Sequence, residues 1–157
     1  MATAEPWRAF PPRRENIIKM LHAAQVDAGD ASHVSDRQLA RIAEYVGIPL
    51  AEAAGVATFY QRFSRRPRGR HVVRVCDSLS CRIRRSLSVY SRLRELLGIG
   101  RDETTPDGMF TLEIVNCLGS CDTAPNLMID DRLYEHVTAE SVEAILAEAA
   151  VAEGAAP

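Results

Sequence analysis

The sequence contains no long apolar run, and this absence limits the kinds of protein that it can be. Of its 157 residues 46% are hydrophobic, yet no stretch approaches the roughly 20 apolar residues that a membrane helix needs. The first eight residues, Met-Ala-Thr-Ala-Glu-Pro-Trp-Arg, hold no apolar core of the secretory type. We therefore expect a globular cytoplasmic chain that reaches a membrane only through a larger complex.

Several motifs of nucleotide binding and catalysis are also missing. Gly98-Ile99-Gly100 lacks the third glycine of a dinucleotide-binding loop and follows a predicted helix rather than a strand. No Cys-x-x-Cys pair is present. The histidines lie in no recognisable catalytic signature. We expect no catalytic residue in this chain; the histidines left unassigned are His22, His33, His71 and His136.

Positive charge is concentrated in one segment. Between Arg62 and Arg85 nine arginines face a single acid, Asp77, so this segment carries +8 and the rest of the chain −10, for a total of −2. Such a run is typical of a solvated connector, or of a surface that binds an acidic protein partner or nucleic acid.

The N-terminal part of the sequence predicts helices. Residues 1–12 are expected to form a flexible tail, followed by a helical unit over residues 13–66. Its first helix has apolar residues at helical spacing from Ile17 to Ala24, and its second begins at a capping box of Ser35 and Gln38 and ends at Gly47. Leu50 to Phe63 predicts a third helix, whose expected apolar face is Val56, Phe59, Tyr60 and Phe63.

Residues 67–152 predict an α/β domain with a mixed sheet, in the order β-α-β-β-β-α. The order and spacing of the apolar residues indicate a strand at 72–75, a helix at 87–97, a turn at 105–108, a strand at 110–115, a hairpin at 127–134 and a helix capped by Thr138.

All four cysteines fall into two pairs. Cys76 and Cys81 are separated by four residues, Cys117 and Cys121 by three, and the pairs themselves by 35. Each pair follows a predicted strand and is expected to lie in a loop, where free backbone amides can point at a bound anion. The pattern favours an iron–sulfur cluster.

Other sites use the same residue types. A structural zinc site usually has Cys-x2-Cys pairs, which are closer than these. Two disulfides are disfavoured in a reducing compartment. A zinc-stabilised nucleic-acid-binding module that uses the arginine segment, and a free-standing ferredoxin, remain as alternatives.

Four segments together resemble one family. They are Gly55-Val56-Ala57-Thr58-Phe59-Tyr60, Val75-Cys76-x4-Cys81, Glu103-Thr104-Thr105-Pro106-Asp107-Gly108 and Cys117-Leu118-Gly119-Ser120-Cys121-Asp122-Thr123-Ala124-Pro125. In this order they resemble the 24-kilodalton subunit of respiratory NADH dehydrogenase (complex I) and its relatives, over about residues 15 to 150. The relatives include subunits of NAD-dependent formate dehydrogenases and NAD-linked hydrogenases.

The resemblance implies a thioredoxin-like [2Fe-2S] ferredoxin domain preceded by an N-terminal three-helix unit. It implies that Cys76, Cys81, Cys117 and Cys121 bind one [2Fe-2S] cluster, which exchanges single electrons with the FMN of a partner flavoprotein that also binds NAD(H). On this basis the chain is a subunit of an NADH dehydrogenase-type oxidoreductase and is not catalytic alone. No nucleic-acid partner is expected.

The sequence departs from the family pattern at two positions near the cysteines. Arg85 stands where the family usually has glycine, and Asn116 stands before the third cysteine, where glutamate is common. An added cation and a lost carboxylate both favour the more negative reduced cluster, so we expect a raised reduction potential.

Overall fold

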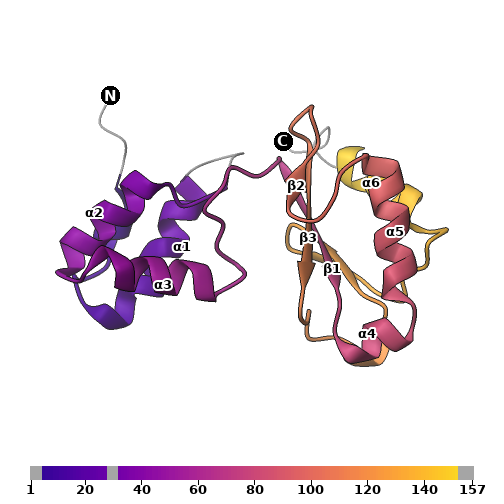
Figure 1. The fold of residues 1–157 in the computed structure, drawn as a ribbon, viewed down its shortest axis with the longest axis horizontal. Helices are drawn as coiled ribbons and strands as arrows, with labels where there is room; N and C mark the ends of the chain where they lie inside the picture. The colour runs from indigo at the N-terminus through magenta and orange to yellow at the C-terminus, as the bar shows by residue number, and fades with distance from the viewer. Residues whose placement is uncertain (1–4, 28–31, 152–157) are drawn as a thin grey trace. The chain divides into compact units, whose positions relative to one another are not determined.

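The computed structural model describes residues 5–27 and 32–151, which divide into two compact units between Arg68 and Gly69 (Figure 1). Each unit has its own group of buried apolar side chains. Within the described ranges, no helix is both long enough and apolar enough to cross a bilayer.

The N-terminal unit is helical. Two short 3-10 helices, η1 (Pro6–Ala9) and η2 (Arg14–Asn16), precede α1 (Ile17–Asp27), α2 (Asp36–Val46) and α3 (Leu50–Phe59). The capping box that starts α2 is confirmed, because Ser35 and Gln38 bond each other's backbone N–H groups. The helix ends at Gly47, whose φ of +76° suits glycine.

Two expectations about this unit are corrected. Within the predicted tail, Trp7 is 2% exposed and lies in the core with Phe10 packed against it, since a large apolar ring gains much from burial. Residues 1–4 lie outside the described residues. The third helix ends at Phe59 instead of Phe63, and Phe59 is 78% exposed while Ala53 and Ala57 are buried.

The second unit is built on a five-stranded mixed sheet of order β2-β3-β1-β4-β5. The central strand β1 (His71–Cys76) runs parallel to β3 (Phe110–Val115) and antiparallel to β4 (Leu127–Ile129). The edge strands are β2 (Glu103–Thr104) and β5 (Arg132–Tyr134). The predicted α/β class with a mixed sheet is confirmed, and β2 is an addition to it.

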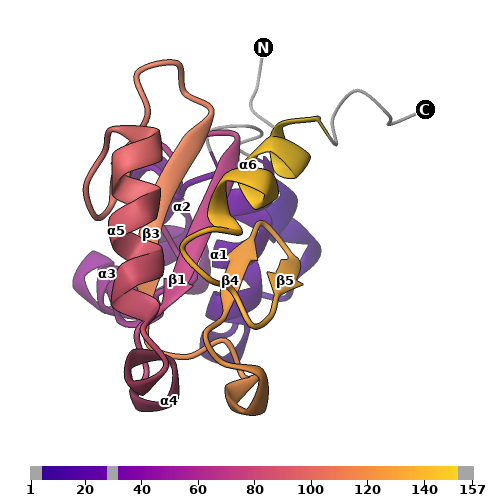
Figure 2. The ribbon, with the colours of Figure 1, turned by 90° about the vertical axis from the view of Figure 1, so that its right-hand side faces the viewer.

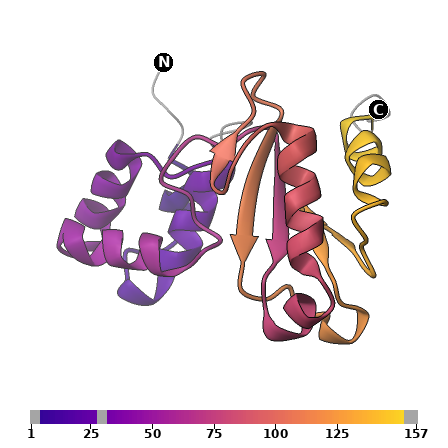
Figure 3. The same ribbon diagram turned by 45° about the vertical axis from the view of Figure 1, so that its right-hand side comes forward.

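Two helices cover one face of this sheet, α5 (Ser86–Leu97) and α6 (Val142–Val151), as Figures 2 and 3 show. Val73 and Val75 of β1 point to that face and pack with residues of both helices. Helix α6 begins at Val142, later than predicted, because Thr138 and Ser141 bond each other in a turn before it.

The direction of β1 and β3 brings the two cysteine segments together. The strands are parallel with Cys76 opposite Val115, so their carboxyl ends meet at one edge of the sheet. Cys76 is the last residue of β1, and Cys117 comes two residues after β3. A short helix, α4 (Leu79–Ile83), also lies at this end in Figure 2.

Candidate metal centre

The first cysteine pair is buried. Cys76 and Cys81 are 1% and 0% exposed and pack with Ala124 from the second cysteine segment. The backbone N–H of Cys76 donates to the Asn126 carbonyl at 3.2 Å, and that of Asp77 donates to Val115 at 2.9 Å. Both bonds tie the end of β1 to the segments around the second pair.

Cys81 lies in a helix, where a loop was expected. Helix α4 forms because the N–H of Arg82 reaches the carbonyl of Ser78 at 2.8 Å and that of Arg84 reaches Ser80 at 3.2 Å. One turn of helix turns the Cys81 side chain back toward Cys76, and it is fully buried. The helical turn thus allows both thiols of this closely spaced pair to be buried in one cluster.

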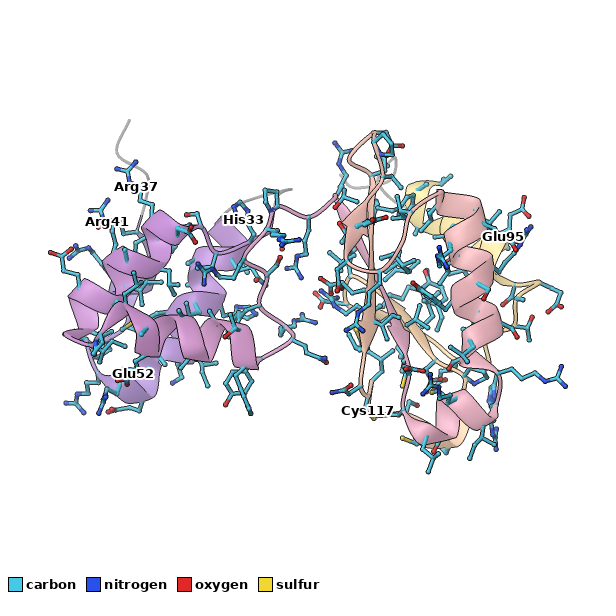
Figure 4. The ribbon with its side chains drawn as sticks, in the orientation of Figure 1. His33, Arg37, Arg41, Glu52, Glu95 and Cys117 are labelled. Carbon is cyan, nitrogen blue, oxygen red and sulfur yellow. The ribbon has the colours of Figure 1, made fainter. Side chains whose placement is uncertain are left out.

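The second pair is exposed. Cys117, labelled in Figure 4, and Cys121 have their sulfurs 3.8 Å apart. Between them Gly119 has a φ of +88°, which turns its N–H toward the Cys117 sulfur at 3.3 Å. Cys121 begins the 3-10 helix η4 (Cys121–Thr123). The predicted position of this loop, directly after a strand, is confirmed, because Cys117 lies two residues after the end of β3.

Burial, neighbouring thiols and backbone N–H donors shift the pKa values of three of the cysteines. Burial, and then a hydrogen bond with Cys76, raises the pKa of Cys81 to about 11. The Gly119 N–H, and then a hydrogen bond with Cys121, lowers the pKa of Cys117, whereas its bond with Cys117 raises the pKa of Cys121. Cys76 is the smallest of the influences that lower the pKa of Cys117.

The residues present fit a two-iron cluster and do not form disulfides. All four cysteines are free thiols, and 3.8 Å between the sulfurs of Cys117 and Cys121 is far beyond a disulfide bond of roughly 2.05 Å. Tetrahedral zinc needs four donors around one point, whereas each iron of a two-iron cluster needs only two thiolates.

The backbone supplies what such a cluster requires. The thiolate ligands and sulfides give the cluster a negative charge, which N–H donors near the sulfurs stabilise. Gly119 donates to Cys117, and Asn126 makes a backbone hydrogen bond to Cys81. The four cysteines and these two donors therefore match the chemistry of an iron–sulfur group.

Sequence patterns did not reveal the residues that fix the two segments to each other. Asn126, 2% exposed, binds Ser120 through its side chain and Cys76 through its carbonyl. Arg84 reaches the Ala124 carbonyl at 3.4 Å. Glu135 binds Ser120 and Thr123 from beyond β5. None belongs to a spacing motif, and only the tertiary fold brings them to the cysteines.

The arginine segment is largely engaged within the chain. Arg68 and Arg74 are 7% and 6% exposed, and Arg74 pairs with Glu113 at 3.0 Å. Arg65 pairs with Asp36 and Arg82 with Asp77. Those bonds leave fewer cations available for a continuous nucleic-acid surface than the sequence indicates.

Two known proteins are similar to this chain in sequence. The E subunit of the NADH-quinone oxidoreductase of Pseudomonas aeruginosa is 48% identical over 113 residues, which are 72% of this chain and 68% of that protein. The corresponding NADH-quinone oxidoreductase protein of Mycobacterium tuberculosis strain H37Rv is 35% identical over 137 residues, 87% of this chain but only 53% of the relative.

A solved structure shares the fold. The air-oxidized NAD+-reducing [NiFe]-hydrogenase superposes with a TM-score of 0.72 at 21% identity, covering 90% of this chain and 24% of the hydrogenase chain. The model of the thioredoxin-like [2Fe-2S] ferredoxin family matches residues 4–150, nearly the whole sequence. The chain therefore belongs to the thioredoxin-like [2Fe-2S] ferredoxin family.

Proposed function

We propose that this chain is the electron-transfer subunit of an NADH:quinone oxidoreductase-type complex, with one [2Fe-2S] cluster held by Cys76, Cys81, Cys117 and Cys121. When bound, such a cluster supplies one-electron redox chemistry, here in exchange with the FMN of a partner flavoprotein that binds NAD(H). The observation that carries the proposal is the meeting of two cysteine pairs at one edge of the sheet, in a chain of this family.

The chain's own residues have separable tasks in this proposal. Cys76 and Cys81 form the buried side of the site, which keeps water from their sulfurs. Gly119 and Asn126 direct N–H groups at Cys117 and Cys81 and so stabilise negative charge on the thiolates. The exposed pair, Cys117 and Cys121, offers the shorter route for an electron to a protein docked on this side.

The surface beside the site supports a protein partner. Leu79 and Ile83 of α4 are 75% and 73% exposed, which is unusual for large apolar side chains so close together. Arg82, Arg84 and Arg85 are exposed beside them. A flavoprotein surface with an apolar centre and acidic side chains around it would complement this face.

The relatives support the choice of complex. The proteins that are 48% and 35% identical to the chain are both components of NADH-quinone oxidoreductases. The hydrogenase likeness is too distant in sequence to favour a hydrogenase. The quinone-linked complex is therefore the parent that we propose, over a formate dehydrogenase or a hydrogenase.

Metal analysis with EPR tests the cluster. Protein purified anaerobically from iron-supplied cells should contain two irons and two sulfides per chain and show a reduced-cluster EPR signal after dithionite. One zinc per chain without sulfide would contradict the proposal. The chain alone should not oxidise NADH, and the appearance of its reduced-cluster signal with NADH should require the added flavoprotein subunit.

A further inference from the structure

A carboxylate outside the cysteine motifs holds the loop that carries the second cysteine pair. Glu135 follows strand β5, and its Oε1 accepts hydrogen bonds from the hydroxyls of Ser120 and Thr123, each at 2.8 Å. These two residues lie on either side of Cys121 in the sequence. The carboxylate thus contacts the loop on both sides of Cys121, through Ser120 and Thr123.

Three short O···O distances link Ser120, Thr123 and Glu135, but the two hydroxyls have only two protons, so at most two of these contacts are hydrogen bonds at one time. The Ser120 and Thr123 oxygens lie 2.8 Å from each other, and each hydroxyl has one proton to donate. Thr123 has other acceptors, the Ser120 carbonyl at 3.2 Å and Asn126 Oδ1 at 3.3 Å, but Glu135 is nearer than both. The bonds with Thr123 and then Ser120 lower the pKa of Glu135, as expected for a carboxylate that accepts them.

The backbone after Glu135 runs beside the same loop. The N–H of His136 donates to the Thr123 carbonyl at 2.8 Å, and that of Val137 donates to the Pro125 carbonyl at 2.9 Å. Val137 is 2% exposed and belongs to the core of the second unit. Glu135 is therefore held at the start of an anchored segment, which lets its side chain restrain the exposed loop.

The two cysteine pairs differ in how much else restrains them. Cys76 and Cys81 are packed among apolar side chains, whereas Cys117 and Cys121 are exposed and lack such walls. For an exposed pair, the direction of the sulfurs must be set by hydrogen bonds within and around the loop. The bonds of Ser120 and Thr123 to Glu135 join this loop to a residue that follows β5.

We propose that Glu135 is a positioning residue for Cys117 and Cys121, acting through Ser120 and Thr123 to fix the loop around the cluster. The inference rests on the proposed function, since it concerns the same site. It assigns to a glutamate outside every cysteine motif a part in cluster geometry and retention.

Matched variants of the full-length holoprotein test this role. Glu135→Ala removes the charge and both acceptor bonds, Glu135→Gln removes only the charge because its amide oxygen can still accept, and Glu143→Ala removes an exposed acid that bonds Arg92 instead. Two readouts are needed: the g-values and line width of the reduced-cluster EPR signal, and the rate of cluster loss to an iron chelator.

The expected pattern separates positioning from charge. Glu135→Ala should change the EPR signal and lose its cluster roughly three to ten times faster, the range expected from the loss of hydrogen bonds to the loop. Glu135→Gln should stay close to the parent protein in both readouts, and Glu143→Ala should match the parent.

Two results would overturn the inference. In one, Glu135→Ala matches the parent in signal and cluster retention. In the other, Glu135→Ala and Glu135→Gln change equally, so that charge alone matters. If Glu135→Ala also lowers the melting temperature, a Ser120→Ala/Thr123→Val variant decides: a changed signal supports positioning and a parental signal refutes it. Absence of iron and sulfide from the parent protein would instead refute the proposed function.

Discussion

The two cysteine segments meet at one edge of the sheet, yet they are built in opposite ways. The first places Cys76 at the end of the central strand and Cys81 in helix α4, both buried. The second places Cys117 and Cys121 in an exposed loop held by hydrogen bonds. The first pair is thus fixed by packing, and the second by polar contacts.

This difference indicates a division of labour in the site. Packed thiols are costly to move and are screened from water, so under the proposed function the first pair would anchor the cluster. Exposed thiols restrained by hydrogen bonds are nearer to a docked protein and more open to adjustment of charge and donors.

The largest expected effect is on folding of the cluster-free chain. Cys81→Ser places a hydroxyl in a fully buried position beside Cys76 and Ala124, which should lower the free energy of unfolding by about 1–3 kcal/mol. Cys121→Ser, at an exposed position, should change it by less than about 0.5 kcal/mol. Urea unfolding of both cluster-free variants measures the two free energies of unfolding. Equal losses would contradict the difference between a packed and an exposed pair.

Thiol reactivity should follow the pKa directions. The thiolate is the reactive form, so a lowered pKa speeds alkylation and a raised pKa slows it. At pH 8 Cys81, with its pKa near 11 and no exposed surface, should react at least about a hundredfold more slowly than Cys117, whose pKa is lowered.

Mass spectrometry of iodoacetamide-treated cluster-free protein over time resolves the individual cysteines. Raising the pH from 8 toward 11 should accelerate Cys81 more than Cys117, because only Cys81 gains much thiolate in that interval. Similar rates at all pH values would show that the first segment is open in solution.

Substitutions at the two left-handed backbone positions should change the free energy of unfolding by a smaller amount, in opposite directions in the two segments. The first segment ends in Arg85 at a φ of +69°, and the second turns at Gly119 at +88°. A left-handed conformation costs a non-glycine residue about 1 kcal/mol, so Arg85→Gly should stabilise the fold by about that amount and Gly119→Ala should destabilise it similarly. No atom lies within 4 Å of a Cβ added at Gly119, so this cost is conformational and not steric.

Thermal unfolding of these two variants measures the effect. A single Arg85→Lys variant is the control, since it keeps both the positive charge and a Cβ in the left-handed conformation. Equal melting temperatures for Arg85→Gly and Arg85→Lys would contradict the expected gain from glycine.

The smallest expected effect concerns the reduction potential. Arg85→Gly combined with Asn116→Glu removes one positive charge and adds one negative charge near the cysteines, which should lower the potential by tens of millivolts. A redox titration followed by EPR measures it, with the exposed Glu143→Ala variant as a remote charge control. A potential equal to or above that of the parent would refute the expectation.

Much of the second unit could be predicted because its elements are locally marked. The strand at 72–75, the helix that ends at Gly98 and the turn at 105–108 each have a pattern or a glycine that specifies them. Helix α4 was missed because Leu79–Ile83 is too short to show a 3.6-residue period. The expected face of α3 was right in part: Val56 and Phe63 pack against the core, whereas Phe59 is exposed and the helix also buries Ala53 and Ala57, which give little periodic signal.

The class of the domain, the grouping of the cysteines into two closely spaced pairs and the family resemblance could be recognised from the order of residues alone, since spacing and local propensity are properties of that order. The burial of one pair, the exposure of the other and the hydrogen bonds of Asn126 and Glu135 to the second cysteine segment are visible only in the folded chain. The physical reason is that burial and hydrogen-bond partners depend on the parallel alignment of β1 with β3, which brings together segments about 40 residues apart.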